Sequence, residues 1–347
     1  MRGLWLAVAT AVALAAAPGA GGEANAGRDD TVWLQQRLDA GGRVYLAPLP
    51  GGECYATRGL WVSRDDTEIF SNGACLVGLG LGERRLNSTD GDPIHAEAVF
   101  YVSRSSVYEP APVRISISGV KITIPDGVAM YGISILGHQS MVRDVEISGA
   151  PIDAIYVGGR GNDGFAARVS VTDSRLLAGR RNVISATGAI DLRIERNVIS
   201  GGSDTYESNP GRPYGNPAAG IDLEPGGRGS PALGVRIAGN RITGNAGPGI
   251  LLALSTNLGL PVLGSQIEIV GNEIVGNGLR ATPPQQGGIV VNGGQDSGGG
   301  RLLVADNVIR GNRGGALVGR PDVNLVIEER GNTLTGAVHL ERARNPR

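Results

Sequence analysis

The sequence has 347 residues, a formal net charge of −1, 57 glycines and only 4% aromatic residues. A net charge so close to zero excludes the basic footprint of a protein that binds nucleic acid or an anionic membrane surface. Glycine at this level without a collagen period, beside 41% hydrophobic residues, predicts many short strands joined by tight turns.

Residues 1–26 have the features of an export signal. Arg2 supplies a positive charge, residues 4–17 form an apolar segment, and Ala24 and Ala26 form a small-residue cleavage site. The apolar segment is too short for a membrane span, and no later segment has the length either. We therefore expect a soluble protein, secreted to the extracellular space after cleavage near Ala26.

Residues 30–38 predict a short amphipathic helix, which Asp30 or Thr31 can cap and whose apolar face includes Trp33 and Leu38. Two glycines end this helix. Strand-like segments follow in the order 43–48, 59–62, 68–70 and 75–77. Residues 79–95 are then a polar, glycine-rich loop.

Cys54 and Cys75 are the two cysteines of the sequence. In an oxidising compartment, such a pair predicts a disulfide that closes a loop of about 22 residues and contributes roughly 3 kcal/mol. Buried free thiols are the alternative. A metal site would need more ligands than the three histidines supply near them.

From about residue 113 the chain repeats a pattern of alternating apolar positions, a turn residue and a further apolar strand. The clearest copies are residues 192–199, 235–242, 267–274, 302–309 and, in a degenerate form, 325–332. Between them lie short strands that often open with glycine, at 132–135, 154–157, 182–185, 220–223, 249–252, 288–291 and 315–318. Three short strands per repeat predict a solenoid whose coils stack as parallel sheets.

Each of the four clearest copies carries an asparagine at its turn: Asn197, Asn240, Asn272 and Asn307. Asparagine tolerates the left-handed backbone of a tight corner, and stacked amides can hydrogen-bond from coil to coil. We therefore interpret these asparagines as architectural.

The asparagine-centred repeats, the Gly-Ile strands and the helix before Gly41-Gly-Arg-Val-Tyr-Leu-Ala-Pro48 resemble the right-handed parallel β-helix, or pectin-lyase-like, superfamily. The resemblance covers about residues 29–340. It implies one all-β domain over 27–347, a single-stranded right-handed parallel β-helix with an N-terminal cap at about 29–80 and repeat coils at about 113–340. It further implies that the helix caps the open end of the core, and that the Gly-Ile strands form the sheet that carries most known active sites.

Asp222 and Glu224 stand out within the Gly-Ile strands. Alternation along a strand directs Ile221 and Leu223 to the core and both carboxylates to the open face, with α-carbons roughly 6.5–7 Å apart. Like charges at this spacing are expected to raise at least one of the two pKa values, as a general acid requires. The alternative is a pair of solvated surface acids.

Aligning these strands on their apolar residues predicts the neighbours of the two acids on adjacent coils, about 4.8 Å away. With Val183, Ile221 and Ala316 all placed inward, Asp222 lies between Ile184 and Leu251. Glu224 lies in a column that runs through Ala186, Ala253 and Asn292.

Long insertions flank the predicted site and can wall a cleft across the sheet suited to a chain-like ligand. The insertion at 202–218 carries residue types common at sugar sites, namely Asp204, Tyr206, Glu207, Arg212 and Tyr214. Substrate-binding candidates from the strands are Tyr156, Asn292 and the pair Arg180 and Arg181, which can bind an acidic sugar but are otherwise ordinary solvated arginines. His138 projects from the same sheet and is a weaker candidate.

The first functional interpretation is a secreted glycoside hydrolase, a monomer without a cofactor, that cleaves a polysaccharide or oligosaccharide with Asp222 and Glu224; their spacing favours inversion. The second is a polysaccharide lyase or epimerase, in which these acids hold Ca²⁺ or neutralise a uronate while an Arg, Tyr or His abstracts a proton. The third is a carbohydrate-binding or surface protein without activity.

Overall fold

The computed structural model describes residues 28–80, 84–86, 93–95, 97–104, 109–125, 128, 130–159, 164–177, 181–203, 217–225, 231–254, 265–279, 286–293, 299–321 and 324–341. The predicted signal sequence at residues 1–26 lies outside these ranges. Within them, no helix combines the length and apolar character needed to cross a bilayer.

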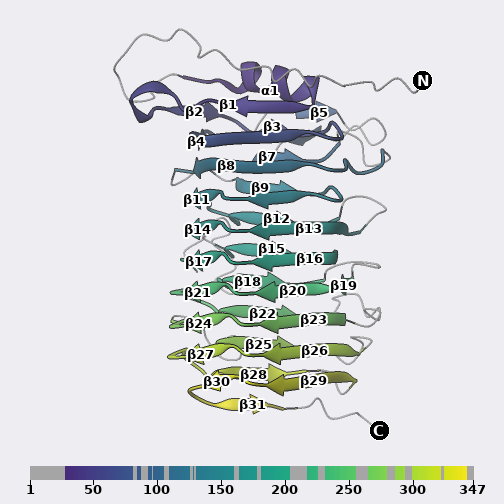
Figure 1. Ribbon diagram of the computed structural model, residues 1–347, viewed down its shortest axis with the longest axis vertical. Helices are drawn as coiled ribbons and strands as arrows, with labels where there is room; N and C mark the ends of the chain where they lie inside the picture. The colour runs from purple at the N-terminus through teal and green to yellow at the C-terminus, as the bar shows by residue number, and fades with distance from the viewer. Residues whose placement is uncertain are drawn as a thin grey trace, which may run out of the picture.

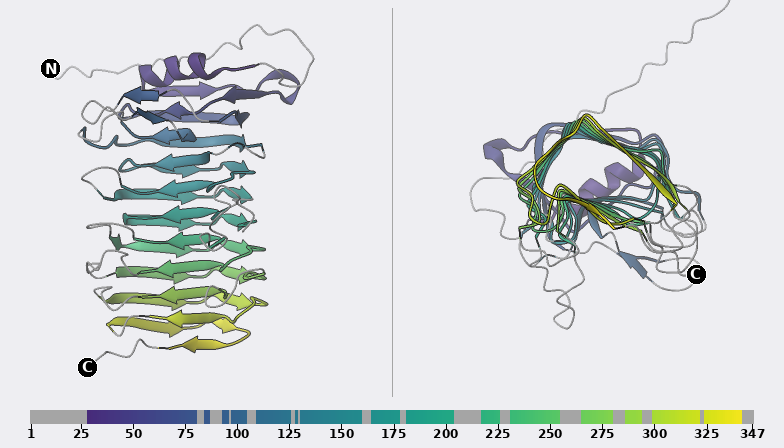
Figure 2. Two further views of the ribbon diagram at one scale, coloured as in Figure 1. Left: turned by 180° about the vertical axis from the view of Figure 1, so that it is seen from behind. Right: turned by 90° about the horizontal axis from the view of Figure 1, so that it is seen from below.

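Parallel strands stack along one axis to form an elongated solenoid (Figure 1). Viewed along that axis, successive coils superimpose around a common interior (Figure 2). One sheet has ten strands: β3 (Leu60–Trp61), β7 (Ala98–Val102), β9 (Tyr131–Ile135), β12 (Ile155–Val157), β15 (Ile184–Ala186), β18 (Ile221–Leu223), β22 (Ile250–Ala253), β25 (Ile289–Asn292), β28 (Leu317–Arg320) and β31 (Val338–Leu340).

The second sheet has nineteen strands and bends around one edge of each coil. They are β1 (Arg43–Leu46), β2 (Cys54–Thr57), β4 (Glu68–Gly78), β8 (Ser116–Thr123), β10 (Met141–Arg143), β11 (Glu146–Ser148), β13 (Ala166–Thr172), β14 (Arg175–Leu177), β16 (Ala189–Glu195), β17 (Val198–Ser200), β19 (Ala232–Leu233), β20 (Val235–Ala238), β21 (Arg241–Thr243), β23 (Ser265–Val270), β24 (Glu273–Val275), β26 (Gly300–Ala305), β27 (Val308–Arg310), β29 (Leu325–Arg330) and β30 (Thr333–Leu334). From residue 141 onward, each coil therefore contributes two strands to this sheet and one to the ten-stranded sheet, with β19 as a third strand in the coil of β20 and β21. This arrangement confirms the predicted solenoid.

The helix α1 (Thr31–Ala40) lies across the N-terminal end of the solenoid (Figures 1 and 2). Leu34 and Leu38 are its buried residues, and they join the main apolar core. Asp30, one of the two predicted residues, is the N-cap residue, but its side chain makes no capping hydrogen bond. The Asp29 carboxylate accepts the backbone N–H of Thr31. Asp30 instead accepts the backbone N–H of Ala56, which ties the start of the helix to β2.

The N-terminal coils differ from the sequence prediction in two places. Residues 68–78 form one strand, β4, with an irregularity between Phe70 and Ala74, rather than two separate strands. Within the predicted loop at 79–95, β5 (Arg84–Leu86) and β6 (Pro93–His95) pair antiparallel. A short 3₁₀ turn, η1 (Pro50–Gly52), precedes β2.

Cys54 and Cys75 form a disulfide, as predicted, between register partners on β2 and β4. Their α-carbons are 4.5 Å apart, which is within the range that a disulfide spans. The bridge therefore ties β2 to β4 in the N-terminal coils. The alternative of two free thiols is wrong.

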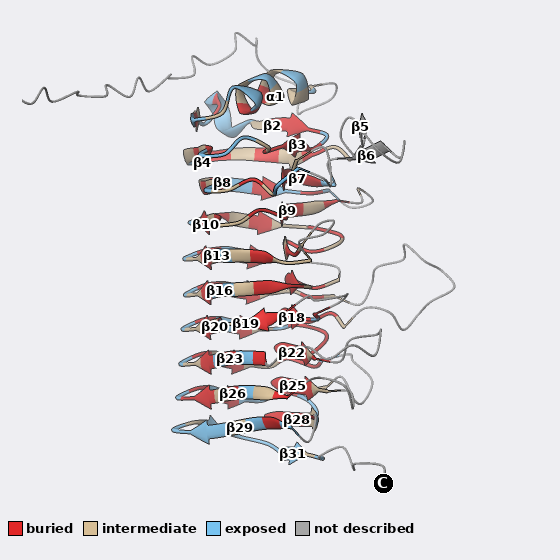
Figure 3. Cartoon of the chain, turned by 90° about the vertical axis from the view of Figure 1, so that its right-hand side faces the viewer, coloured by how far each residue is buried: buried red, intermediate tan, exposed pale blue. Residues whose placement is uncertain are grey.

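Stacked isoleucines, valines and leucines fill the interior, because each strand directs every second side chain inward. Ile221, Ile250 and Ile289 are register partners with no exposed surface, and so are Leu252 and Val291. Figure 3 shows this burial continuing along both sheets until the last coil, where β29 and β31 are exposed.

The predicted architectural role of the asparagines is confirmed at atomic detail. Asn197, Asn240, Asn272, Asn307 and Asn332 form a continuous ladder in which each side-chain oxygen accepts the backbone and amide N–H groups of the preceding asparagine. A second ladder joins Asn245, Asn277 and Asn312 at the next corner. The two ladders satisfy polar groups at the corners, where the sheet hydrogen bonds are interrupted.

Candidate functional site

Asp222 and Glu224 lie where β18 crosses the outer face of the ten-stranded sheet. Ile221 and Leu223 point into the core, as alternation requires. The two carboxyl groups differ in exposure, however. Glu224 is exposed, whereas only 2% of Asp222 is exposed, so the expectation that both acids stand on an open face is wrong for Asp222.

The predicted neighbours of Asp222 require a correction by one residue. The register pairs Ile184, rather than Val183, with Ile221, so that Ser185 rather than Ile184 lies beside Asp222. Leu251 lies on the other side, as predicted.

The same shift affects the neighbours of Glu224 and the C-terminal coil. Continuing the register by one residue places Thr187, rather than Ala186, beside Glu224, with Ala253 on the opposite side. In the C-terminal coil, Leu317 rather than Ala316 pairs with Ile289.

The error arose because two consecutive apolar residues begin the strand. Val183 and Ile184 are both fully buried, so hydrophobic alternation alone does not identify which of them faces the core. Asn182 decides the register in the structure. Its side-chain oxygen accepts the backbone N–H of Ala219, 2.9 Å away on the next coil, which makes Asn182 a corner residue rather than the first strand residue.

Asp222 belongs to a buried polar network that runs back across two coils. Its Oδ2 accepts a hydrogen bond from Asn182 Nδ2 at 2.9 Å, and the same nitrogen donates to Ser185 Oγ at 3.0 Å. Asp153, which is fully buried, accepts hydrogen bonds from the Asn182 backbone N–H at 3.0 Å and from Arg181 Nε at 2.9 Å. Arg181 Nη2 donates to the second oxygen of Asp153. None of these contacts was predicted from the sequence, and all except the local Asn182–Ser185 contact join residues that lie 28 to 40 positions apart.

Burial raises the pKa of Asp222 well above the ordinary value of an aspartic acid, and the negative charges of Glu224 and Asp153 raise it further. The positive charge of Arg181 and the hydrogen bond from Asn182 oppose this rise without cancelling it. Asp222 Oδ1 is buried and has no hydrogen-bond partner. The rise in pKa expected from two neighbouring carboxylates is therefore present at Asp222, although burial is its largest cause.

Two half-buried tyrosines cover the outer face on the N-terminal side of Asp222. The Tyr131 and Tyr156 rings lie 5.4 Å apart, and Tyr156 Oη is 2.6 Å from Thr187 Oγ1. Burial raises the pKa of both phenols. Tyr156 was predicted from the sequence to face this site, whereas Tyr131, which opens β9 three coils before Asp222, was missed.

The outer face changes character on the C-terminal side of Asp222. Leu251, Val290 and Val318 occupy the same column on β22, β25 and β28, and they form a buried apolar cluster with Ala219. Asp222 therefore lies at a boundary, with polar and aromatic side chains towards the N-terminus and aliphatic side chains towards the C-terminus.

Comparison with known proteins identifies the fold family. Residues 131–329 match the family described as the right handed beta helix region. The chain belongs to this family. Among proteins of curated function, none matches the sequence of this β-helix protein.

Three solved structures show how widely this fold is used. The tailspike protein of Acinetobacter baumannii phage AM24 superposes with a TM-score of 0.53 at 10% identity, over 91% of this chain and 51% of the tailspike. The enzymatically active domain of tailspike protein 2 from bacteriophage CBA120 gives 0.50 at 15% identity, over 83% of this chain and 41% of that domain. The Streptococcus pneumoniae surface protein and adhesin PfbA gives 0.50 at 13% identity, over 91% and 96% of the two chains. This chain thus spans about half or less of the two tailspike chains.

The remaining predicted site residues are only partly placed. Asn292 ends β25, is half-buried, and pairs in register with Ala253, as predicted. His138 accepts the backbone N–H of Ala167 through Nδ1 and so helps to join two coils. The other candidates lie outside the described residues: Arg180, Asp204, Tyr206, Glu207, Arg212 and Tyr214. In the described part of the chain, no group of three or more His, Cys, Asp or Glu residues is placed to hold a metal ion.

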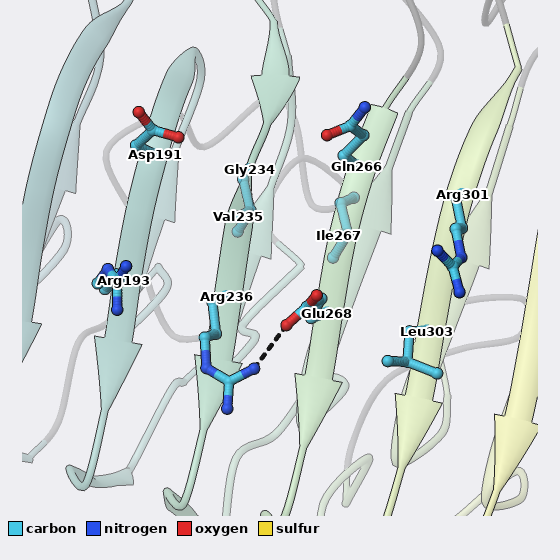
Figure 4. Close-up of a pocket in the computed structure, with 10 residues that line it drawn as sticks. All are labelled: Asp191, Arg193, Gly234, Val235, Arg236, Gln266, Ile267, Glu268, Arg301 and Leu303. Atoms are coloured by element: carbon cyan, nitrogen blue, oxygen red, sulfur yellow. Dashed lines mark hydrogen bonds and ion pairs between the residues drawn. The ribbon is translucent and has the colours of Figure 1, made fainter.

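A groove of about 400 Å³ lies on the outer face of the other, nineteen-stranded sheet of the β-helix (Figure 4). Its floor is formed by β16, β20, β23 and β26. Gly234 lies between Asp191 and Gln266 in one outward column, and because glycine has no side chain it leaves space there. Arg236 and Glu268 form an ion pair across it at 2.5 Å. The charged groups of this groove are exposed and largely paired, so it has the character of a solvated surface rather than of a catalytic site.

Proposed function

We propose that this β-helix protein is an exported enzyme that hydrolyses a polysaccharide or oligosaccharide, with Asp222 as the general acid and Glu224 as its partner. The observation that carries the proposal is the buried carboxyl group of Asp222 on the outer face of a solenoid, where acidic side chains are ordinarily solvated. Burying a carboxyl group with one oxygen unpaired costs stability. Such a cost is typical of a functional site.

The raised pKa of Asp222 supports the role of proton donor, because it extends the protonated form to higher pH. In the proposed reaction, Asp222 protonates the glycosidic oxygen while the bond from that oxygen to the anomeric carbon breaks. Glu224 accepts a proton from the water that attacks the anomeric carbon. Two positions that are two residues apart on one strand have α-carbons roughly 6.5–7 Å apart. Carboxyl groups held at a similar distance favour inversion over a covalent intermediate.

The ionisation of the neighbouring groups favours hydrolysis over a lyase or epimerase reaction. Those reactions need a base that abstracts a carbon-bound proton. Burial raises the pKa of Tyr131 and Tyr156, which disfavours the phenolate form of each. Although burial alone would lower the pKa of Arg181, the hydrogen-bonded Asp153 carboxylate raises it, so Arg181 is held as a cation. The raised pKa of Asp222 also disfavours binding of Ca²⁺, because a carboxyl group must lose its proton to act as a ligand.

The β-helix fold by itself supports both an enzyme and an adhesin, since both kinds of protein are among the similar structures. The Asp222 site favours an enzyme, because a buried acid with a raised pKa is not needed to bind a glycan. Contact between a substrate oxygen and Oδ1 requires the surface over this carboxyl group to open. We therefore expect the free protein to represent a closed form of the site.

The proposal is tested by incubating the purified mature protein with neutral and acidic polysaccharides, with and without a chelator. New reducing ends without unsaturated-uronate absorbance, unaffected by the chelator, are the expected result. Absorbance that the chelator abolishes would identify a Ca²⁺-dependent lyase instead. Binding without any product would identify a recognition protein.

Site variants then test the assignment of the two acids. Asp222→Asn and Glu224→Gln keep nearly the same shape, and each is expected to lower kcat by at least about 10²-fold. Glu329→Gln is the matched control, because Glu329 is an exposed acid on β29 of the other sheet. Normal turnover by both site variants would show that the acids are assigned wrongly.

A further inference from the structure

Asn182 holds Asp222 in one orientation. Asn182 is 1% exposed, and each end of its amide has a partner. The oxygen accepts the Ala219 backbone N–H, while Nδ2 donates to Asp222 Oδ2 and to Ser185 Oγ. An amide with this set of partners cannot be reversed without placing its oxygen against a carboxyl oxygen. Its N–H group therefore points permanently at Oδ2.

Asp153, on the preceding coil, fixes Asn182 together with Arg181, the sequence neighbour of Asn182. Asp153 lies just before β12 and receives both the Asn182 backbone N–H and the Arg181 guanidinium. An arginine with two hydrogen bonds to one carboxylate is a rigid pair of fixed geometry. The position of Asn182 is thus set by a neighbouring coil as well as by its own backbone.

We propose that Asn182 is a positioning residue for the proton donor Asp222, and that the Arg181–Asp153 pair holds it in place. The inference rests on the proposed function, in which Asp222 is the general acid. An oxygen that accepts an N–H group is better suited to be the carbonyl oxygen of a protonated carboxyl group. The acidic proton is therefore kept on Oδ1, the buried oxygen that has no hydrogen-bond partner and that a substrate reaches once the surface over it opens.

The charges around Asp222 predict that two variants shift its pKa in opposite directions. The groups that face Asp222 are the carboxylates of Glu224 and Asp153, the Arg181 cation and the Asn182 amide. Removing the amide donor destabilises the carboxylate form, so Asn182→Ala raises the pKa of Asp222 further. Asp153→Asn removes a negative charge and leaves Arg181 unbalanced, so it lowers the pKa of Asp222.

The test is a titration of the free enzyme by NMR, with ¹³C-labelled aspartate carboxyl groups and Asp222→Asn to assign the signal. We expect the midpoint of Asp222 to rise by about one pH unit in Asn182→Ala and to fall by about one unit in Asp153→Asn. Asn72→Ala, at an exposed position in β4, is the control and leaves the midpoint unchanged. If Asn182→Ala does not fold, Arg181→Gln replaces it, because removing the cation also raises the pKa of Asp222.

Shifts of the same sign in Asn182→Ala and Asp153→Asn, or no shift in either, would overturn the inference. Once a substrate is known, the basic limb of the pH profile of kcat/KM should move in the same two directions. Asn182→Ala should also lower kcat by roughly 10-fold and leave KM nearly unchanged, because the variant loses the orientation of the acid rather than substrate binding. The titration needs no substrate, whereas the proposed function is tested by the turnover of Asp222→Asn, so the two can fail separately.

Discussion

Removing one amide from the asparagine ladder tests how strongly the corners hold the coils together. In Asn240→Ala, the side chain that accepts the backbone N–H and the amide N–H of Asn197, at 2.9 and 3.0 Å, is lost. Both donors belong to a residue that is 1% exposed, so water does not replace the acceptor. Each buried donor without a partner costs about 1–3 kcal/mol, which predicts a loss of about 2–6 kcal/mol in the free energy of unfolding.

The measurement is equilibrium unfolding in urea, followed by far-ultraviolet circular dichroism on the purified mature protein. Asn72→Ala is the matched control, because Asn72 is an exposed asparagine of β4 outside the ladders. The control should change the unfolding free energy by no more than about 0.5 kcal/mol. If Asn240→Ala is as stable as Asn72→Ala, the ladder does not contribute the stability that its hydrogen bonds suggest.

Three further predictions concern stability. Reducing the Cys54–Cys75 disulfide, which closes a loop with a sequence separation of 21, should lower the unfolding free energy by roughly 3 kcal/mol, and an unchanged melting temperature would contradict this. Asp222→Asn should stabilise the fold at pH 7 but not at pH 3. Because the pKa of Asp222 is higher in the folded protein than in the unfolded chain, Asp222 lowers stability only at pH values above its unfolded pKa. An equal gain in melting temperature at both pH values would contradict this. Gly249→Ala should lower the unfolding free energy by about 1–3 kcal/mol, because the added Cβ would lie 2.6 Å from a methyl group of Ile274 in the core. Gly271→Asn should be nearly neutral in the same assay, because Gly271 faces open space and asparagine tolerates its φ of +65°.

Much of the architecture follows from patterns of neighbouring residues that can be recognised in the sequence. Three features recur along the chain: asparagine at the corners, apolar alternation, and glycine before most of the inward isoleucines of the ten-stranded sheet. One repeat therefore explains most features of the others. Gly249 shows why: a side chain there would collide with the carbonyl of Gly288 on the next coil, so the close stacking of coils selects glycine. The disulfide was predictable because two cysteines allow only one pairing.

The candidate site was predictable only in part. Alternation was sufficient to place Asp222 and Glu224 on the outer face of β18, since it depends on neighbouring residues alone. It could not fix the register of β15, because Val183 and Ile184 are equally apolar and equally buried. The choice between them was made by Asn182, whose amide bonds to a residue 37 positions away.

Burial of the acid was also beyond local rules. Asp222 is buried and linked to Asn182 because coils separated by long insertions stack directly on one another. Asp153, Arg181 and Asp222 come from three successive coils, and their charges act on each other through distances that sequence spacing does not encode. The sequence determined which residues form the sheets and that both acids lie on the outer face, whereas stacking between coils buried Asp222 and raised its pKa.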